Sequence, residues 1–239
     1  MVDLSTFKDK YDYAKLFDYN IVGTRETTTE ELYACLEIQK KYKFGCFQTG
    51  PHMIPIVKRE LEGIDCEIGA VIDFPYGYSD RKTKMDATKN AVALGANALD
   101  LVLNIGALKD HRYKDCLEEL KEHVKYAEGC VTKPIVEVCL LTDDELRAAS
   151  EICVEAGATF VKTSSGTAGG PSLQHILIIR KVVEGTGVKI KAGVSYPKDI
   201  NAAAFVIAGC DRIGSRDAVK IVEQFDTMRE IGLIPAYTG

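Results

Sequence analysis

The sequence predicts an α/β protein folded as a (β/α)8 barrel. Short apolar runs, many of them rich in β-branched residues, alternate with longer amphipathic stretches along the 239-residue chain. Eight such runs can be assigned, and this length is close to the roughly 250 residues typical of the barrel. A doubly wound open sheet is the alternative, but the nucleotide-binding patterns GxGxxG and GxxxxGK[ST] are both absent from the sequence.

The eight expected strands are short and end at polar or glycine-containing segments. They are Phe17–Val22, Phe44–Gln48, Cys66–Asp73, Leu99–Asn104, Pro134–Leu140, Thr159–Thr163, Val188–Ala192 and Asp211–Gly214. In a barrel of this class, catalytic groups lie where strands end and the loops to the helices begin.

The expected helices occupy the amphipathic stretches between the strands. They are Thr29–Tyr42, Ser79–Leu94, Tyr113–Ala127, Thr142–Ala156, Ser172–Glu184, Pro197–Ala208 and Ala218–Ile231. The first opens with Thr-Thr-Glu-Glu, which is typical of a capping box. The helix from Thr142 opens with acidic residues, which the positive end of a helix dipole favours.

Composition favours one domain over residues 1–239. The chain is 46% hydrophobic, and its seven prolines are scattered, with no linker-like segment. A formal net charge of −5 argues against an electrostatic nucleic-acid footprint, although a local basic pocket can still exist. No run approaches the roughly 20 apolar residues of a membrane span, and the first residues do not form a signal segment. These observations predict a cytoplasmic protein with no membrane partner.

The eight cysteines support the same expectation of an intracellular protein. None forms a CxxC pair, and several lie inside apolar runs, where a reduced thiol packs as a small hydrophobic group. Reduced thiols are typical of intracellular proteins.

Lys162 is the most informative single residue. It closes the apolar run Ala158–Thr163 and is followed by the glycine-rich segment Ser164–Gly170. A buried ammonium loses hydration, and a second cation nearby lowers its pKa further, which leaves free amine to attack a carbonyl and form a Schiff base. The alternative is a structural lysine that extends out of the strand end or pairs with a carboxylate.

Other polar residues cluster at the expected strand ends. They are Asp18 and Asn20 in the first strand, Asp100 and Asn104 in the fourth, Glu137 in the fifth, Thr163 in the sixth, and Lys189 and Lys191 in the seventh. Lys189 and Lys191 share one face of their strand because side chains alternate with a period of two. Lysines and an aspartate converging on neighbouring strands are costly to bury, so they indicate a function. Asp100 fits either a salt-bridge partner or a proton-relay carboxylate.

Four segments carry a family resemblance that spans roughly Phe17 to Val222. They are GANALDLVLNIGALKD from Gly95, IVEVCLLTDDEL from Ile135, EAGATFVKTSSG from Glu155 and DRIGS from Asp211. In this order they resemble the deoxyribose-phosphate aldolases, class I enzymes of deoxyribonucleotide catabolism. The resemblance implies a (β/α)8 barrel, agreeing with the strand count.

The resemblance also implies residue roles. Lys162 matches the Schiff-base lysine and Asp100 the proton-relay aspartate. An ungapped comparison places the second catalytic lysine at Lys189, and a gap would place it at Lys191. The substrate-binding residues it suggests are Asp18, Asn20, Thr163, Ser165, Gly169, Gly170, Lys191, Gly193, Gly214, Ser215 and Arg216.

The chain departs from the family where phosphate is expected to bind. Ala192–Ser195 stands in place of a Gly-Gly-Ile-Arg-like turn, and Ser215–Asp217 in place of a serine-rich run. Strand one ends in Asp18-Tyr19-Asn20 instead of Asp-His-Thr, and the loop after Lys162 is one residue short. Arg216 can replace the lost hydroxyl contacts by a charge-assisted pair, or it can be neutralised by Asp217.

The predicted function is therefore a carbon–carbon lyase. Its expected reaction cleaves 2-deoxyribose 5-phosphate to acetaldehyde and glyceraldehyde 3-phosphate, with no metal or organic cofactor. The four histidines, His52, His111, His123 and His175, lack ligand spacing and are expected at the surface. Two alternatives remain: a Schiff-base aldolase for another or an unphosphorylated sugar, and a non-catalytic barrel that binds a sugar or phosphate. The sequence also allows a homo-oligomer.

Overall fold

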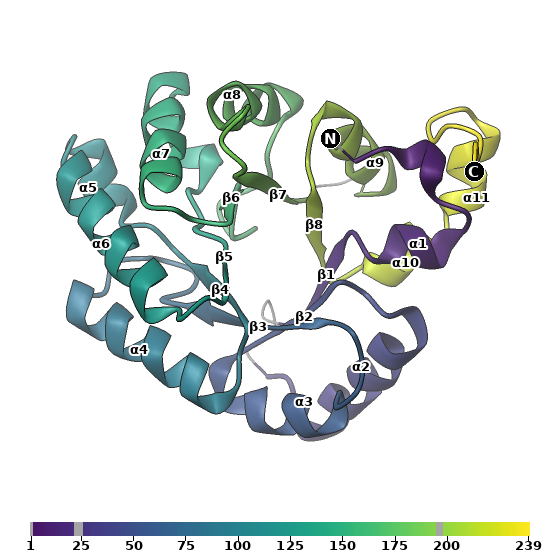
Figure 1. Ribbon diagram of the computed structural model, residues 1–239, viewed down its shortest axis with the longest axis horizontal. Coiled ribbons are helices and arrows are strands. Elements are labelled where there is room, and N and C mark those ends of the chain that lie inside the picture. Colours follow the sequence, from purple (N-terminus) through teal and green to yellow (C-terminus); the bar gives the residue numbers. More distant parts are fainter. Residues whose placement is uncertain (1, 22–25, 195–197) are drawn as a thin grey trace.

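The computed structural model describes residues 2–21, 26–194 and 198–239, and shows the expected barrel. Eight parallel strands form one sheet in the order β5-β4-β3-β2-β1-β8-β7-β6. Viewed down the barrel, the strands form a central ring and the helices an outer one, with the two ends of the chain on the same side (Figure 1). The predicted fold class is confirmed.

The elements follow the predicted alternation. The strands are β1 Phe17–Asn20, β2 Cys46–Thr49, β3 Glu67–Ile72, β4 Ala98–Leu101, β5 Val131–Thr132, β6 Phe160–Lys162, β7 Lys189–Gly193 and β8 Arg212–Ser215. The α-helices are α1 Lys10–Ala14, α2 Thr29–Tyr42, α3 Ile54–Glu60, α4 Arg81–Leu94, α5 Ile105–Lys109, α6 Tyr113–Tyr126, α7 Asp143–Glu155, α8 Leu173–Val183, α9 Lys198–Ala208, α10 Ala218–Val222 and α11 Phe225–Glu230. No helix among the described residues is long and apolar enough to cross a bilayer.

The barrel closes between β5 and β6 through single bridges. Ile135 pairs with Val102 on one side and with Lys162 on the other. The backbone N–H of Lys162 donates to the Pro134 carbonyl at 2.8 Å, and the N–H of Val136 donates to the Lys162 carbonyl at 3.0 Å. These bonds tie both the N–H and the carbonyl of Lys162 to the neighbouring segment Pro134–Val136, which fixes the position of the strand end that carries it.

Strand five is the largest correction to the sequence prediction. The run Pro134–Leu140 is not a strand: the regular pairing of β5 comes earlier, and Val138–Leu140 forms a 3₁₀ turn. Pro134 has no N–H for a sheet ladder, and Glu137 adopts the left-handed conformation with a φ of 54°. The apolar pattern of this run thus reflects burial and not continuous strand geometry.

Helix starts agree with the local signals. Thr28 and Glu31 form a capping box before α2, and Thr142 and Glu145 form another before α7. The stretch Ala218–Ile231 is divided into α10 and α11, and the short helices α1, α3 and α5 were not predicted. The expected ends at Val22 and Pro197 lie outside the described residues.

A buried polar cluster joins α4 to α6 outside the barrel. The Lys84 Nζ lies 2.9 Å from Glu119 Oε1 and donates to the Val102 carbonyl at 3.0 Å. His123 is also buried here, with its Nδ1 2.9 Å from the Thr88 hydroxyl, so the prediction that all four histidines lie at the surface is wrong for His123. Burial lowers the pKa of His123 to about 4, which keeps its ring neutral.

We expect Lys84→Met to destabilise the protein by about 3 to 5 kcal/mol, because it leaves the Glu119 carboxyl buried without its cation. Urea unfolding measures this free energy. Lys82→Met, which removes an exposed pair with Asp86, is the control and should change stability little. The double variant Lys84→Met/Glu119→Leu should recover most of the loss; a double variant as unstable as Lys84→Met would contradict this explanation.

Candidate active site

A cavity of about 410 Å³ opens at the C-terminal ends of the strands. It is lined by residues from the strand ends and the loops that follow them: Asn20, Gln48, Phe74, Lys162, Ser164, Ser165, Gly166, Thr167, Gly169, Gly170, Lys191, Gly193, Val194, Lys198, Gly214, Ser215 and Arg216. This is the end of the barrel at which enzymes of the fold carry their active sites.

Two lysines and one aspartate meet at the base of this cavity. The Nζ atoms of Lys162 and Lys191 each lie 2.6 Å from the same oxygen, Oδ2 of Asp100. Lys162 is 7% exposed, whereas Asp100 is fully buried and Lys191 is 1% exposed. The other carboxyl oxygen, Oδ1 of Asp100, is buried with no hydrogen-bond partner among the described residues. This oxygen can therefore accept a proton, but Asp100 itself is not among the residues that line the cavity.

This geometry prepares Lys162 to act as a nucleophile. Burial, opposed by Asp100 and assisted by the ammonium of Lys191, lowers the pKa of Lys162 to about 8. Burial alone would raise the pKa of Asp100, but the adjacent ammonium groups outweigh it and hold the pKa below its usual value. The site thus combines an amine that is partly free near neutral pH with a carboxylate that stays ionised.

Lys189 does not join this cluster. It begins β7 and is exposed, with its Nζ 5.9 Å from the centre of the Phe160 ring. The strand alternation does place Lys189 and Lys191 on one face, as predicted, but they lie at different depths. The structure brings Lys191, not Lys189, to Lys162 and Asp100, which corresponds to the gapped reading of the sequence.

Asp18 lies beneath the site and does not line the cavity. Its Oδ2 is 2.5 Å from Lys191 Nζ and 2.9 Å from Lys133 Nζ, and its Oδ1 accepts from Arg212 at 2.8 Å. Burial would raise the pKa of Asp18, but these three cations hold it well below its usual value. Asp18, which was predicted to bind substrate, is therefore an ion-pair partner of Lys191 on the side away from the cavity.

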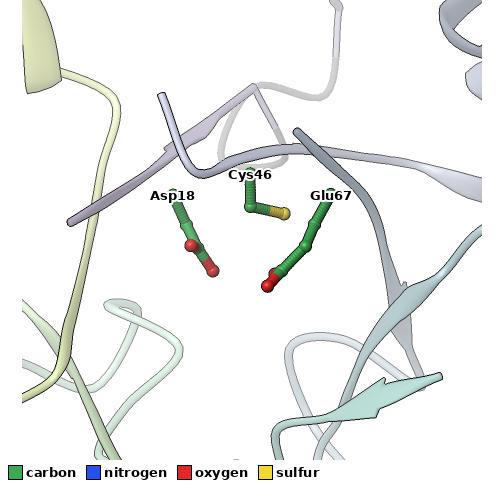
Figure 2. Close-up of side chains that lie close together, drawn as sticks. All are labelled: Asp18, Cys46 and Glu67. Atoms are coloured by element: carbon green, nitrogen blue, oxygen red, sulfur yellow. The ribbon is translucent and has the colours of Figure 1, made fainter. Parts of the chain in front are cut away.

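Asp18, Cys46 and Glu67 point toward one another, with potential ligand atoms within 4.8 Å (Figure 2). This donor set does not fit a metal ion. Both carboxylates already accept from Lys133 and Arg212. Burial also raises the pKa of the Cys46 thiol well above its usual value, so the thiol stays protonated and is a poor ligand.

Two glycines make room for the polar side chains. A Cβ on Gly214 would lie 3.3 Å from Cε of Lys191, and one on Gly69 would lie 2.0 Å from Oε1 of Gln48. Gly214 of the DRIGS segment therefore leaves space for Lys191 in the barrel.

The loop after β6 covers one side of the cavity. The N–H of Ser165 donates to the Glu137 carboxylate at 3.1 Å, and the Cys139 thiol lies 3.1 Å from the Gly170 carbonyl oxygen. Gly169 adopts a φ of 126°, where a side chain would be strained, while Thr163 is buried and accepts from the Gly193 N–H at 3.2 Å. Ser165, Gly169 and Gly170 line the cavity as predicted, whereas Thr163 is not among the lining residues and its hydroxyl bonds to β7 instead.

The mouth of the cavity carries two cations. Arg216 is exposed and lines the cavity, and within the described part of the chain its guanidinium makes no ion pair. Asp217 instead pairs with Lys198, and with Lys220 at 3.1 Å. The alternative in which Asp217 neutralises Arg216 is not the one observed. The predicted lining residues Asn20, Gly193, Gly214 and Ser215 complete this region; Ser195 lies outside the described residues.

Several site residues were missed from the sequence. Lys198 begins α9, and a helix start beside the expected phosphate loop is the signal that could have identified it. Lys133 directly precedes the expected strand Pro134–Leu140 and therefore lies outside the range in which strand-end residues were expected. Arg212 lies two residues before Gly214, so the period of two could have placed it in the barrel interior.

We expect the amine of Lys162 to react with acetic anhydride with a midpoint near pH 8, because only the deprotonated form is nucleophilic and its pKa is about 8. Mass spectrometry of the Lys162 peptide across a pH series measures this. Lys82, whose pKa a hydrogen bond to Asp86 raises above 10.5, is the internal control and should react only at higher pH. Parallel titration of the two lysines would contradict the assignment.

Comparison with known proteins identifies the family. Residues 12–214 match the model of the DeoC/LacD family aldolases. The deoxyribose-phosphate aldolase of Bacillus cereus (strain AH820) is 41% identical over 212 residues, covering 87% of this chain and 94% of the relative. The chain therefore belongs to the DeoC/LacD aldolase family. Aldolases are carbon–carbon lyases, which confirms the predicted class of enzyme.

Solved structures agree with this assignment. The deoxyribose phosphate aldolase from Aeropyrum pernix, described as tetrameric, superimposes with a TM-score of 0.85 at 26% identity, covering 94% of this chain and 95% of that one. A protein described as QR15, an aldolase, gives a TM-score of 0.84 at 30% identity, covering 92% and 98%.

Proposed function

We propose that this protein is a class I aldolase that cleaves 2-deoxyribose 5-phosphate to acetaldehyde and glyceraldehyde 3-phosphate. The observation that carries the proposal is the pair of lysines sharing Asp100 Oδ2 at the base of an open cavity. The relatives named deoxyribose-phosphate aldolase support the substrate.

The proposed reaction begins with attack of the neutral Lys162 amine on C1 of the open-chain sugar. Loss of water together with uptake of one proton gives a protonated imine, whose positive nitrogen accepts electrons. The C3 hydroxyl then loses its proton, the C2–C3 bond breaks, and its electron pair forms an enamine while C3 leaves as the aldehyde of glyceraldehyde 3-phosphate. Protonation of the enamine at C2 and hydrolysis of the imine release acetaldehyde and restore the amine.

Asp100 and Lys191 are placed to move the protons in these steps. Asp100 stays ionised, and within the described residues its Oδ1 has no hydrogen-bond partner, so it can accept a proton that the neighbouring lysines or water relay from a carbinolamine or a hydroxyl. Lys191 contacts the opposite oxygen and lines the cavity, so it can return a proton and also keep Lys162 from being protonated. This assigns the second catalytic role to Lys191 in place of Lys189.

Phosphate is proposed to bind at the mouth between β7 and β8. Arg216 brings to the cavity a guanidinium that makes no ion pair among the residues the structure describes, and Lys198 adds an ammonium held by Asp217. Charge-assisted hydrogen bonds from these groups can replace the hydroxyl contacts that the sequence lacks. This placement favours a phosphorylated sugar over an unphosphorylated one.

We expect borohydride with acetaldehyde to reduce an imine onto the peptide that contains Lys162, because that amine is the nucleophile. Lys162→Ala should abolish the trapped adduct in mass spectrometry. Lys189→Ala, at an exposed lysine of the same barrel, should trap like the unmodified protein. Stoichiometric trapping in Lys162→Ala would show that another amine forms the imine and would refute the proposed reaction. An absence of trapping in the unmodified protein would favour a non-catalytic sugar-binding barrel.

Asp100→Asn and Lys191→Leu should each lower turnover by about 10²-fold or more, the scale of a positioned acid or base, without unfolding the barrel. Lys189→Leu should retain nearly full turnover because its side chain lies away from the cluster. Steady-state cleavage assays with circular dichroism as a folding check measure these effects. If Lys189→Leu loses turnover while Lys191→Leu keeps it, Lys189 and not Lys191 is the second catalytic lysine.

Arg216→Ala should lower kcat/KM for 2-deoxyribose 5-phosphate by about 10- to 150-fold, the range for losing a charged hydrogen bond, and leave free 2-deoxyribose nearly unchanged. Lys198→Ala should act in the same direction. Lys220→Ala is the matched control, since Lys220 also pairs with Asp217 but does not line the cavity. An equal loss on both sugars would support an aldolase for an unphosphorylated substrate.

A cytoplasmic location and a homo-oligomeric state are also proposed. The tetrameric relative supports assembly, and light scattering of the purified protein would measure the subunit number.

A further inference from the structure

The active-site lysines are the upper end of a continuous ion-pair network in the barrel core. Below Lys191, Asp18 bonds to Lys133 and Arg212. Both of these cations also bind Glu67: Lys133 Nζ lies 2.6 Å from Oε2 and Arg212 Nη2 lies 3.0 Å from Oε1. The side chains of Lys133 and Asp18 are at most 1% exposed, while that of Glu67, on the first residue of β3, is 21% exposed.

The network holds more positive than negative groups. Its cations are Lys133, Lys162, Lys191 and Arg212, and its carboxylates are Asp18, Glu67 and Asp100. With every group ionised, the buried network carries one excess positive charge. Such a charge is costly in a protein interior, so one cation tends to lose its proton.

The excess charge is most easily relieved at Lys162. Lys133 contacts two carboxylates, Lys191 also contacts two, and Arg212 contacts two and cannot deprotonate in a protein. Lys162 is the member that pairs with one carboxylate only, and it shares that oxygen with Lys191.

We propose that Lys133, Arg212 and Glu67 are positioning residues that set the charge balance of the barrel core, so that the proton missing from the network is the one on Lys162. None of the three lines the cavity, so they act through Asp18 and Lys191 and not by touching the substrate. The direction of the pKa shift at Lys162, downward to about 8, agrees with this arrangement.

Within the described residues, the other polar groups near the network make no ion pair with its members. Above, the Phe74 ring lies 5.9 Å from the Lys162 ammonium, and Glu137 bonds to the Ser165 N–H. Below, the Cys46 thiol stays protonated, and Lys189 faces the Phe160 ring from an exposed position.

The test compares two nearly isosteric substitutions of opposite charge effect. Lys133→Met removes one cation from the network, and Glu67→Gln removes one anion from its more exposed end. Lys189→Met is the control, since it removes a cation outside the ion pairs. Acetylation of Lys162 by acetic anhydride, followed across pH by mass spectrometry, measures its titration midpoint in each folded protein, and thermal unfolding reports stability separately.

We expect the midpoint of Lys162 to rise by about one pH unit in Lys133→Met and to fall by a similar amount in Glu67→Gln, the size of a single buried charge acting over several ångströms. Lys189→Met should leave the midpoint of Lys162 within about 0.3 pH units of its value in the unmodified protein. If the residues had a purely structural role, both variants would lose thermal stability without opposite shifts of the Lys162 midpoint. That result, or midpoint shifts of the same sign in both variants, would overturn the proposal.

If Lys133→Met does not fold, Glu67→Gln decides alone: a fall supports the proposal and an unchanged or raised midpoint overturns it. The inference rests on the proposed Schiff-base function for its biological meaning, but acetylation needs no aldol chemistry. Failure of borohydride trapping in the unmodified protein would reject the function, whereas unshifted acetylation midpoints would reject only the charge-balance proposal.

Discussion

The shared carboxylate oxygen of Asp100 is the contact on which the site depends. Two lysines from neighbouring strands meet it at the same distance, so neither ammonium can be treated separately from the other. Burial and their mutual repulsion favour loss of one proton, while their attraction for the carboxylate keeps Asp100 ionised. A barrel supplies this arrangement because alternating residues of parallel strands project into one enclosed interior.

The fold was predictable because it depends on repeated patterns. Apolar runs, capping residues and spacing gave the order of the elements, and Lys162 with Asp100 were chosen correctly as neighbours because a charge inside an apolar strand is costly. The depth of Lys189 and Lys191 was not predictable, because the period of two assigns a face and not a distance along the barrel axis. Strand five was assigned wrongly because burial and strand geometry give similar apolar runs, and Glu137 turns the chain out of the ladder.

The lower network was missed for a related reason. Lys133, Glu67 and Arg212 lie far apart in the sequence, and each is an ordinary residue in its own segment. Only the closed barrel brings them to Asp18. Pairwise sequence patterns do not contain this contact, because it depends on the stagger of four strands. The same limit applies to Lys198, whose partner Asp217 follows the next strand.

Positive charge is compensated differently in the barrel interior and at the cavity mouth. In the interior, three carboxylates compensate most of the cations, and this keeps Lys162 reactive without exposing it to water. At the mouth, Arg216 remains without an ion pair in the part of the chain that the structure describes, so its charge is available to an anionic substrate. Asp217 could have neutralised it, but binds Lys198 and Lys220 instead. In the interior, the charges therefore balance only when Lys162 is neutral, whereas at the mouth the charge of Arg216 can attract a phosphate.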